Sequence, residues 1–157
     1  MWTDPQHVSL RVITSETVRA VCALAVGEGQ SNLVAPNAIS LAEALFSPSA
    51  WYRAIYLNEE VVGFVMLYDQ SLGPSSAPSP KVVVWRFMID AGSQRKGIGR
   101  AALLRVVEHV RSKGLFSALS LSYVPAPGCA EKFYLGLGFT PTGKLEDGEV
   151  ELELSLK

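Results

Sequence analysis

The sequence contains few of the residues from which disulfides and metal sites are built. Cys22 and Cys129 are its only cysteines, and it has two histidines. Two distant cysteines cannot form the disulfide framework of a small secreted domain, and with so few histidines they give no set of metal ligands. Residues 1–8 also lack the apolar core of a signal peptide. We therefore expect a reduced, cytoplasmic setting and no metal.

The sequence also lacks a strong charge of one sign and a long apolar run. Its formal net charge is −1, whereas nucleic-acid-binding proteins usually carry a large basic excess. No apolar stretch approaches the roughly 20 residues of a membrane-spanning helix. We therefore expect neither nucleic acid nor a membrane as a partner. Hydrophobic residues make up 48% of the 157 positions, which predicts a single domain over residues 1–157.

Residues 82–114 form the most informative stretch. The strand-forming run at 82–89 is typical of a central strand that is covered on both faces. From Ile98 onward apolar residues recur at helical spacing, with charged residues on the opposite face. Between the two, Gly97 and Gly99 lie where backbone N–H groups at a helix N-terminus can converge on an anion. The stretch predicts a phosphate-binding loop between a strand and a helix.

Two other glycine-containing phosphate motifs fit this loop less well. The P-loop of nucleoside triphosphatases needs Gly-x-x-x-x-Gly-Lys-Ser/Thr, which the sequence does not contain. Gly97, Gly99 and Ala102 satisfy the spacing of a dinucleotide-binding fingerprint. However, residues 90–96 separate the first glycine from the strand, and no acidic residue closes the next strand near Tyr123.

Hydrophobic patterning and turn residues predict a mixed α+β domain with a sheet of about seven strands and about four helices. We expect the strands at residues 9–13, 51–57, 61–68, 82–89, 117–123, 139–142 and 149–156. The helices are expected at residues 18–27, 40–46, 98–114 and 129–138. The strand–helix–strand order around residues 98–114 implies that the two strands are parallel. Asp147 and Gly148 predict the turn of a closing hairpin.

Two segments carry a family resemblance. The segment from Gln94 to Gly99 resembles the Gln/Arg-x-x-Gly-x-Gly/Ala pyrophosphate-binding signature of the GNAT superfamily of acyl-CoA-dependent N-acetyltransferases. Residues 133–139, FYLGLGF, resemble the family's Tyr-x-x-x-Gly-Phe segment. The expected order of elements is similar to the GNAT arrangement over the whole chain.

A narrower similarity concerns bacterial spermine/spermidine, or diamine, N-acetyltransferases. It rests on VAPNAISLAEA (34–44), WRFMID (85–90), FYLGLGF (133–139) and DGE (147–149). The resemblances imply a GNAT fold and acetyl-CoA as co-substrate. They also imply a small primary amine as acceptor, with polyamines such as spermidine among the candidates, and a homodimer paired through the last strands.

The GNAT resemblance assigns roles to individual residues. Tyr134 would protonate the leaving CoA thiolate, which is feasible because a phenol and a thiol have similar reference pKa values. A backbone N–H near Met88 or Ile89 would polarise the thioester carbonyl, where the central strand splays from the next one. Many family members have an Asn that contacts CoA where Pro127 stands here, so that contact is lost or replaced. The residues expected to bind CoA are Phe87, Met88, Ile89, Gln94, Arg95, Lys96, Gly97, Ile98, Gly99 and Arg100.

The sequence leaves alternatives open for the general base and for the residues that line the cleft of the acceptor amine. An alkylamine must lose a proton to react, and Glu28, Asp69, Asp90 and Glu149 are the candidate bases, with Glu28 preferred. Arg86 interrupts the otherwise apolar central strand, and Trp85 is expected on the opposite face. Arg86 either pairs with a carboxylate such as Asp90 or lines the acceptor cleft, and Trp85 is either a core residue or an aromatic wall for an aliphatic cation.

Three other functions remain to be distinguished from transfer to a small amine. The first is a non-catalytic acyl-CoA sensor, which keeps the phosphate-binding loop without the chemistry. The second is a GNAT enzyme acting on a protein or peptide amine, and the third is one acting on an antibiotic. A covalent acyl-enzyme on Cys129 is disfavoured because no histidine lies near it in the sequence. Direct attack by the amine is therefore expected.

Overall fold

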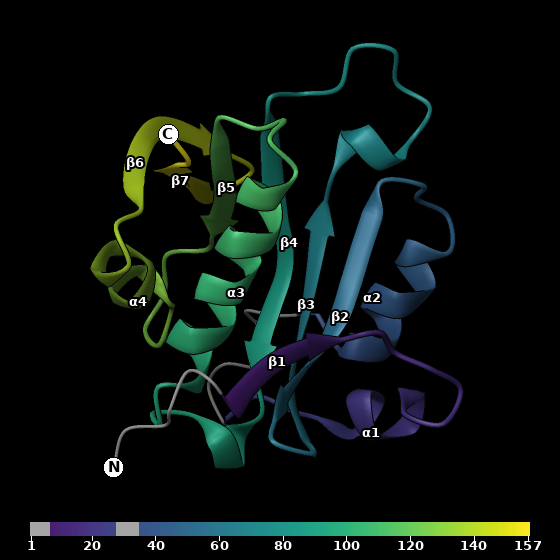
Figure 1. Cartoon of the computed structure of the whole chain (residues 1–157). Coiled ribbons are helices and arrows are strands. Elements are labelled where there is room, and N and C mark those ends of the chain that lie inside the picture. Colours follow the sequence, from purple (N-terminus) through teal and green to yellow (C-terminus); the bar gives the residue numbers. More distant parts are fainter. Residues whose placement is uncertain (1–6, 28–34) are drawn as a thin grey trace.

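The protein folds around one seven-stranded mixed sheet with helices on both faces (Figure 1). The computed structural model describes residues 7–27 and 35–157. Its strands are β1 (Val8–Arg11), β2 (Ala50–Leu57), β3 (Glu60–Tyr68), β4 (Lys81–Ile89), β5 (Ala118–Tyr123), β6 (Thr140–Glu146) and β7 (Glu149–Ser155). The α-helices in the described ranges are α1 (Val18–Ala23), α2 (Asn37–Ala44), α3 (Ile98–Ser112) and α4 (Glu131–Gly136). The predicted α+β class is confirmed.

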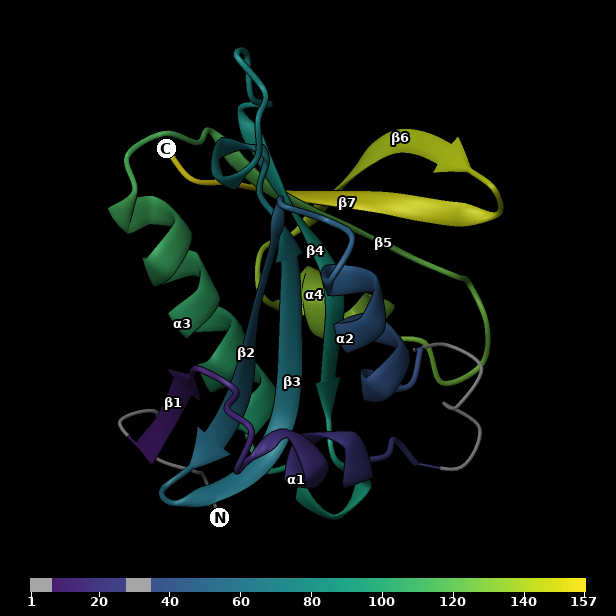
Figure 2. The ribbon, with the colours of Figure 1, turned by 90° about the vertical axis from the view of Figure 1, so that its right-hand side faces the viewer.

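The sheet has the order β1-β2-β3-β4-β5-β7-β6. Only β4 and β5 are parallel, and every other neighbouring pair is antiparallel. The parallel pair is the one that the strand–helix–strand order predicted, with α3 as the crossover. Figure 2 shows α3 on one side of the sheet and α1 and α2 on the other.

Two hydrophobic clusters fill the space between the sheet and these helices. The larger one lies on the α3 side and includes Val82 and Val84 of β4, and the smaller one lies on the α1 and α2 side and includes Met88. The predicted apolar face of α3 is buried in the larger cluster, as Ala102, Leu103, Val106, Val107 and Val110. Each fully buried Val or Leu side chain among them contributes about 1.5–3 kcal/mol relative to an exposed one.

A β-bulge in β4 corrects the expected alternation. Met66 of β3 lies opposite Arg86, but Leu67 lies opposite Val84, so Trp85 is an extra residue in β4. A bulge shifts the side chains that follow it to the other face. Phe87 therefore packs with the α3-side cluster, whereas Trp85 packs with the other one. The prediction that Trp85 and Arg86 lie on opposite faces is wrong, because both face α2.

Burial of β4 also differs from the prediction. Val82 and Val84 are buried, but Val83 is 36% exposed, and residues 85–87 are half-buried. β4 is therefore not covered on both faces along its whole length, contrary to the prediction from the sequence.

Two helix boundaries differ for identifiable reasons. α1 ends at Ala23 instead of near Gly27, because Leu24 is extended and Ala25 is bonded to the end of β4. α2 begins at Asn37, three residues before the expected start, since the Pro36 carbonyl accepts hydrogen bonds from the backbone at 39 and 40.

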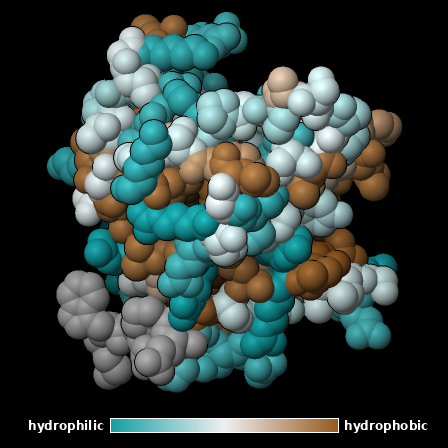
Figure 3. Space-filling model, turned by 45° about the horizontal axis from the view of Figure 1, so that its top comes forward, coloured by the Kyte–Doolittle hydropathy of each residue, from teal (hydrophilic) through white to brown (hydrophobic). Residues whose placement is uncertain are grey.

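The predicted turn at Asp147 and Gly148 is confirmed by their positive φ values of 53° and 79°, the conformation that a two-residue hairpin turn needs. No helix of the described chain is long and apolar enough to span a membrane. On the face of Figure 3, exposed apolar residues form separate patches between polar ones.

Candidate functional site

The two parallel strands separate after a short paired segment. Pairs join β4 and β5 at 81–83 and 118–120, and in the described residues no pair joins them beyond Val83. The rest of β5 pairs only with β7. The edge of β4 that faces β5 therefore loses its strand partner over residues 84–89. We call this opening the β4–β5 splay.

Backbone N–H groups point into the β4–β5 splay. The N–H of Asp90 donates to the carbonyl of Val62 in β3 at 2.8 Å. Successive N–H groups along a strand point to opposite sides. The N–H groups of Phe87 and Ile89 therefore point away from β3 and toward the splay. The resemblance implied a donor near Met88 or Ile89, and this geometry favours Ile89.

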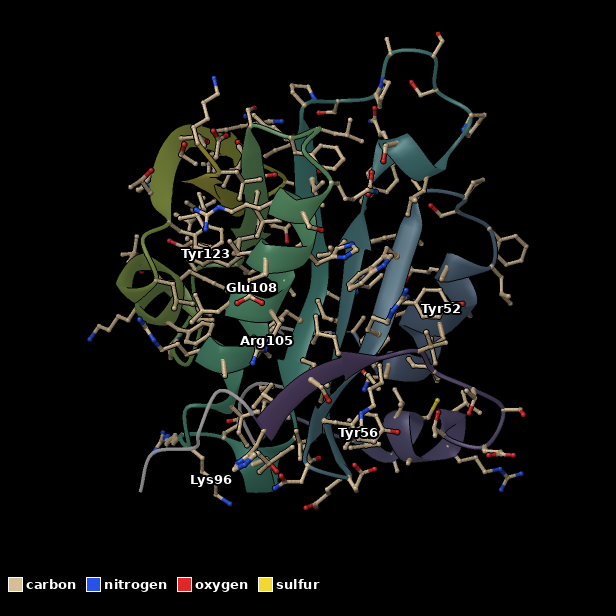
Figure 4. The ribbon with its side chains drawn as sticks, viewed as in Figure 1. Tyr52, Tyr56, Lys96, Arg105, Glu108 and Tyr123 are labelled. Atoms are coloured by element: carbon tan, nitrogen blue, oxygen red, sulfur yellow. The ribbon has the colours of Figure 1, made fainter. Side chains whose placement is uncertain are left out.

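The loop between β4 and α3 brings cations to a helix N-terminus. Gly97 caps α3 with φ of 80°, and Arg95 also has a positive φ of 62°. Arg95, Lys96 and Arg100 are exposed, and none of them forms an ion pair within the described chain. The Lys96 ammonium donates to the Gly92 carbonyl, and its side chain points outward from the loop (Figure 4). The N-terminus of a 15-residue helix with three cations is suited to a phosphorylated ligand.

Two contacts fix this loop. The side-chain amide of Gln94 donates to the Ile89 carbonyl at 2.9 Å, so Gln94 ties the loop to the end of β4. A Cβ atom on Gly99 would lie 3.4 Å from the Phe133 ring, so α4 packs closely against the start of α3. Phe133 also stacks on Phe87 with ring centres 6.3 Å apart. The sequence-predicted residues of β4, the loop and α4 are thus brought together.

Tyr134 lies in the core beside this junction. It is 8% exposed and belongs to the α3-side cluster, together with Ile89 and Ile98. Its ring meets Phe133 and Phe139 edge to face, at 5.2 and 5.7 Å. Burial raises the pKa of Tyr134 to about 12, so the phenol stays protonated at neutral pH. The raised pKa also makes the phenol a weaker acid than its reference value implies.

The opposite face of β4 carries a second constellation. The Arg86 guanidinium lies 3.4 Å from the Glu43 carboxylate of α2 and 5.6 Å from the centre of the Trp85 ring. Trp85 meets Tyr68 edge to face at 6.0 Å. The Nε atom of Arg86 is buried without a hydrogen-bond partner in the described residues.

Arg86 therefore pairs with Glu43, not with Asp90. Asp90 instead accepts a hydrogen bond from the backbone N–H of Ala25 at 2.9 Å. Sequence reasoning missed Glu43, although it is the only charged residue of α2. That isolation within an otherwise uncharged helix was the available indication.

The other candidate bases have different surroundings. Asp69 is 2% exposed and binds Lys113 and Ser71. Burial raises its pKa, but the hydrogen bonds from Lys113 and Ser71 outweigh this effect, and the net pKa is lowered. Glu149 lies beside the β6–β7 turn. Glu28 lies outside the described residues.

A small hollow adjoins that turn. It measures about 120 Å³ and is lined by Ser122, Lys144, Glu146, Asp147, Glu149 and Glu151. The carboxylates outnumber the cations here, and Lys144 already pairs with Glu146. In the described residues, no three His, Cys, Asp or Glu side chains are grouped to hold a metal ion.

Residues 15–139 match the sequence model described as "Acetyltransferase (GNAT) family". Comparison with curated protein sequences gave no match.

Several solved structures are similar in fold. A protein from Desulfovibrio desulfuricans described as a GNAT-family acetyltransferase superposes with a TM-score of 0.71 and 18% identity, over 96% of this chain and 99% of that chain. The PaiA N-acetyltransferase from Thermoplasma acidophilum, solved with coenzyme A, gives 0.69 and 15%, over 94% and 98%. The ribosomal-protein-S18-alanine N-acetyltransferase from Escherichia coli gives 0.68 and 14%, over 96% and 94%.

Proposed function

The chain belongs to the acetyltransferase (GNAT) family and is an acyl-CoA-dependent acetyltransferase, and from this premise we propose that its single domain transfers an acetyl group to a primary amine of a small molecule. The observation that carries the proposal is the β4–β5 splay, because the N-terminus of α3 follows β4 and Tyr134 belongs to the same hydrophobic cluster as Ile89. Acetyl-CoA, the co-substrate, supplies the activated acetyl group.

The residues of the loop and of β4 would hold the donor. Exposed Arg95, Lys96 and Arg100 lack carboxylate partners in the described chain, and charge-assisted hydrogen bonds from them suit a pyrophosphate. The backbone N–H of Ile89 would stabilise negative charge on the carbonyl oxygen, as oxyanion donors do.

Two protons must then move. The amine nitrogen attacks the carbonyl carbon directly, the carbon–sulfur bond breaks, and the sulfur leaves as a thiolate. Tyr134 would give its proton to that thiolate. A base would take the surplus proton of the amine, and Glu28 remains the first choice. Glu43 is an added candidate, because it pairs with Arg86, which is a proposed lining residue of the cleft for the acceptor amine.

Replacing Tyr134 by Phe tests this assignment. We expect kcat to fall by about 10²–10⁴-fold, because general acid catalysis is lost, with little change in the Kd for CoA. Tyr56→Phe is a matched control, since Tyr56 is also 8% exposed but lies in β2 away from the splay. Full activity in Tyr134→Phe would contradict the role of the phenol, and a wild-type chain that binds CoA without turnover would be a sensor.

A polyamine such as spermidine is the acceptor that we propose first. The acidic hollow at the β6–β7 turn supports a polycationic acceptor, and Trp85 and Tyr68 offer aromatic faces to an alkylammonium. CoA release should be measured with a panel of amines. If spermidine is not acetylated but a peptide N-terminus or an aminoglycoside is, the proposal of a polyamine acceptor is wrong. The acetyltransferase activity itself would still stand.

A homodimer is also proposed. β6 forms one edge of the sheet, all of its residues are exposed, and within residues 7–27 and 35–157 it pairs with β7 alone. An unpaired edge strand is a ready surface for a second copy. Light scattering coupled to gel filtration would show twice the chain mass for a dimer and the chain mass for a monomer.

A further inference from the structure

A second and larger hollow lies on the α3 side of the sheet, apart from the residues proposed for acetyl transfer. Its volume is about 630 Å³, within the range of about 300–1,000 Å³ typical of small-molecule sites. Its walls are β1, Trp51 and Arg53 of β2, and Arg105, Glu108 and His109 of α3. Figure 4 shows Arg105 and Glu108 projecting from the middle of α3.

Arg53 is the unusual residue of this hollow. It is half-buried, and its guanidinium donates to the Tyr52 carbonyl at 2.7 Å. It forms no ion pair with any residue of the described chain, and burial lowers its pKa. The guanidinium has the Tyr52 carbonyl and the Trp51 ring as partners, and an anion in the hollow would supply the opposite charge that no carboxylate of the described chain provides.

An aromatic platform lies beside this cation. The rings of Trp51 and His109 stack with centres 4.3 Å apart and an angle of 20°, and the Arg53 guanidinium lies 4.4 Å from the Trp51 ring centre. The stack joins β2 to α3, so its position is set by two elements of the core. The two aromatic side chains give this wall of the hollow apolar contact area for a flat ligand body.

The charges of the hollow also favour an anion. Arg105 pairs with Glu108 at 3.2 Å, and the described lining residues of the hollow include two arginines and one carboxylate. His109 adds no charge at neutral pH, because burial, Lys113 and Arg53 lower its pKa. On the face of Figure 3, exposed apolar residues form separate patches instead of one broad surface for a protein partner.

We propose that this hollow binds an aromatic carboxylate of metabolite size, with its carboxylate on the Arg53 guanidinium and its ring against the Trp51–His109 stack. A guanidinium and a carboxylate form paired, charge-assisted hydrogen bonds, and the ring fills the apolar part of the hollow. The site is separate from the one proposed for acetyl transfer, so acetyl-CoA and this ligand are expected to bind together.

Isothermal titration with 2-naphthoate, with and without saturating CoA, tests the proposal. We expect a saturable one-to-one complex whose Kd is unchanged by CoA, and weakening of at least about tenfold in Arg53→Gln. Arg111→Gln is the control, because Arg111 is an exposed arginine of α3 outside the hollow, and it should bind like the parent protein. 2-Naphthylmethanol, which has the ring without the charge, should bind at least about tenfold more weakly.

Absence of binding, competition by CoA, or equal binding of the alcohol would overturn the proposal. If Arg53→Gln does not fold, intermolecular NOEs in the parent protein decide instead. Contacts from the naphthoate ring to the Trp51 or His109 ring would support the site, and contacts confined to other residues would refute it.

Discussion

The two ends of α3 carry the same kinds of cation in opposite circumstances. At the N-terminal end, Arg95, Lys96 and Arg100 are exposed and have no carboxylate partner in the described chain. At the C-terminal end, the Lys113 ammonium binds the buried carboxylate of Asp69. The cation at the C-terminal end is held in an ion pair with the fold, whereas those at the N-terminal end have none in the described residues, as the proposed pyrophosphate site requires.

The helix dipole gives this difference a physical meaning. The N-terminus of a helix carries partial positive charge and its C-terminus partial negative charge. Lys113, the C-cap residue of α3, is therefore stabilised where it lies. Three cations at the N-terminal end oppose the dipole, and only a bound anion turns that arrangement into a favourable one.

Removing the Asp69–Lys113 ion pair at the C-terminal end of α3 should have the largest effect on stability. In Asp69→Ala, Lys113 is left partly buried without its carboxylate, and we expect the free energy of unfolding to fall by about 3 kcal/mol. The Kd for acetyl-CoA should hardly change. Urea unfolding measures the first quantity and calorimetric titration the second.

The control is Glu59→Ala, which removes an exposed ion pair with Arg11 and should cost less than about 1 kcal/mol. A loss in Asp69→Ala no larger than in this control would show that the buried pair does not hold the end of α3.

Removing a positive charge from the N-terminal end of α3 should instead weaken the binding of acetyl-CoA. Arg95→Gln and Arg100→Gln should each raise the Kd for acetyl-CoA by about tenfold, or about 1.4 kcal/mol, with a smaller effect at high salt. The free energy of unfolding should stay the same or rise slightly, because repulsion at the helix N-terminus is relieved. An unchanged Kd in both variants would remove these arginines from the cofactor site.

The smallest effect is expected from His109, which lies one turn before Lys113. Burial is the main cause of its lowered pKa, so below the unfolded value of about 6.5 the unfolded chain binds a proton more readily than the folded chain. Stability should therefore fall between pH 7 and pH 5.5, by less than about 1 kcal/mol for this partly exposed group.

His109→Gln should reduce that pH dependence, whereas His7→Gln should leave it in place. Denaturant midpoints at the two pH values measure it. A decline of equal size in His109→Gln and in the parent protein would assign the pH dependence to other groups.

Local patterns predicted the elements that depend on neighbouring residues. α3 begins at Ile98 as expected, because apolar residues at helical spacing follow a glycine cap. The turn at 147–148 was predicted because its conformation is a property of Asp-Gly itself. The shorter α1 was not, since it is ended by bonds from Ala25 to the distant end of β4.

The features of the candidate site also fall into those that local patterns indicated and those that they did not. The sequence indicated the glycine loop before α3 and Tyr134, the residues proposed to bind CoA and to protonate its thiolate, because both lie in short segments of recognisable spacing. It did not indicate the bulge at Trp85, the Arg86–Glu43 pair or the hollow around Arg53. Each of these depends on how strands pair or on which helix covers which face.

The sequence by itself determined the α+β class, the strand–loop–helix unit and the position of its glycines, because periodicity and backbone preference act over a few residues. Only the tertiary structure decided that β4 and β5 part after three pairs, that Tyr134 is buried in the same cluster as Ile89, and which cations have carboxylate partners. Strand register and ion pairing join residues that are far apart in the chain, and no local pattern specifies their distance.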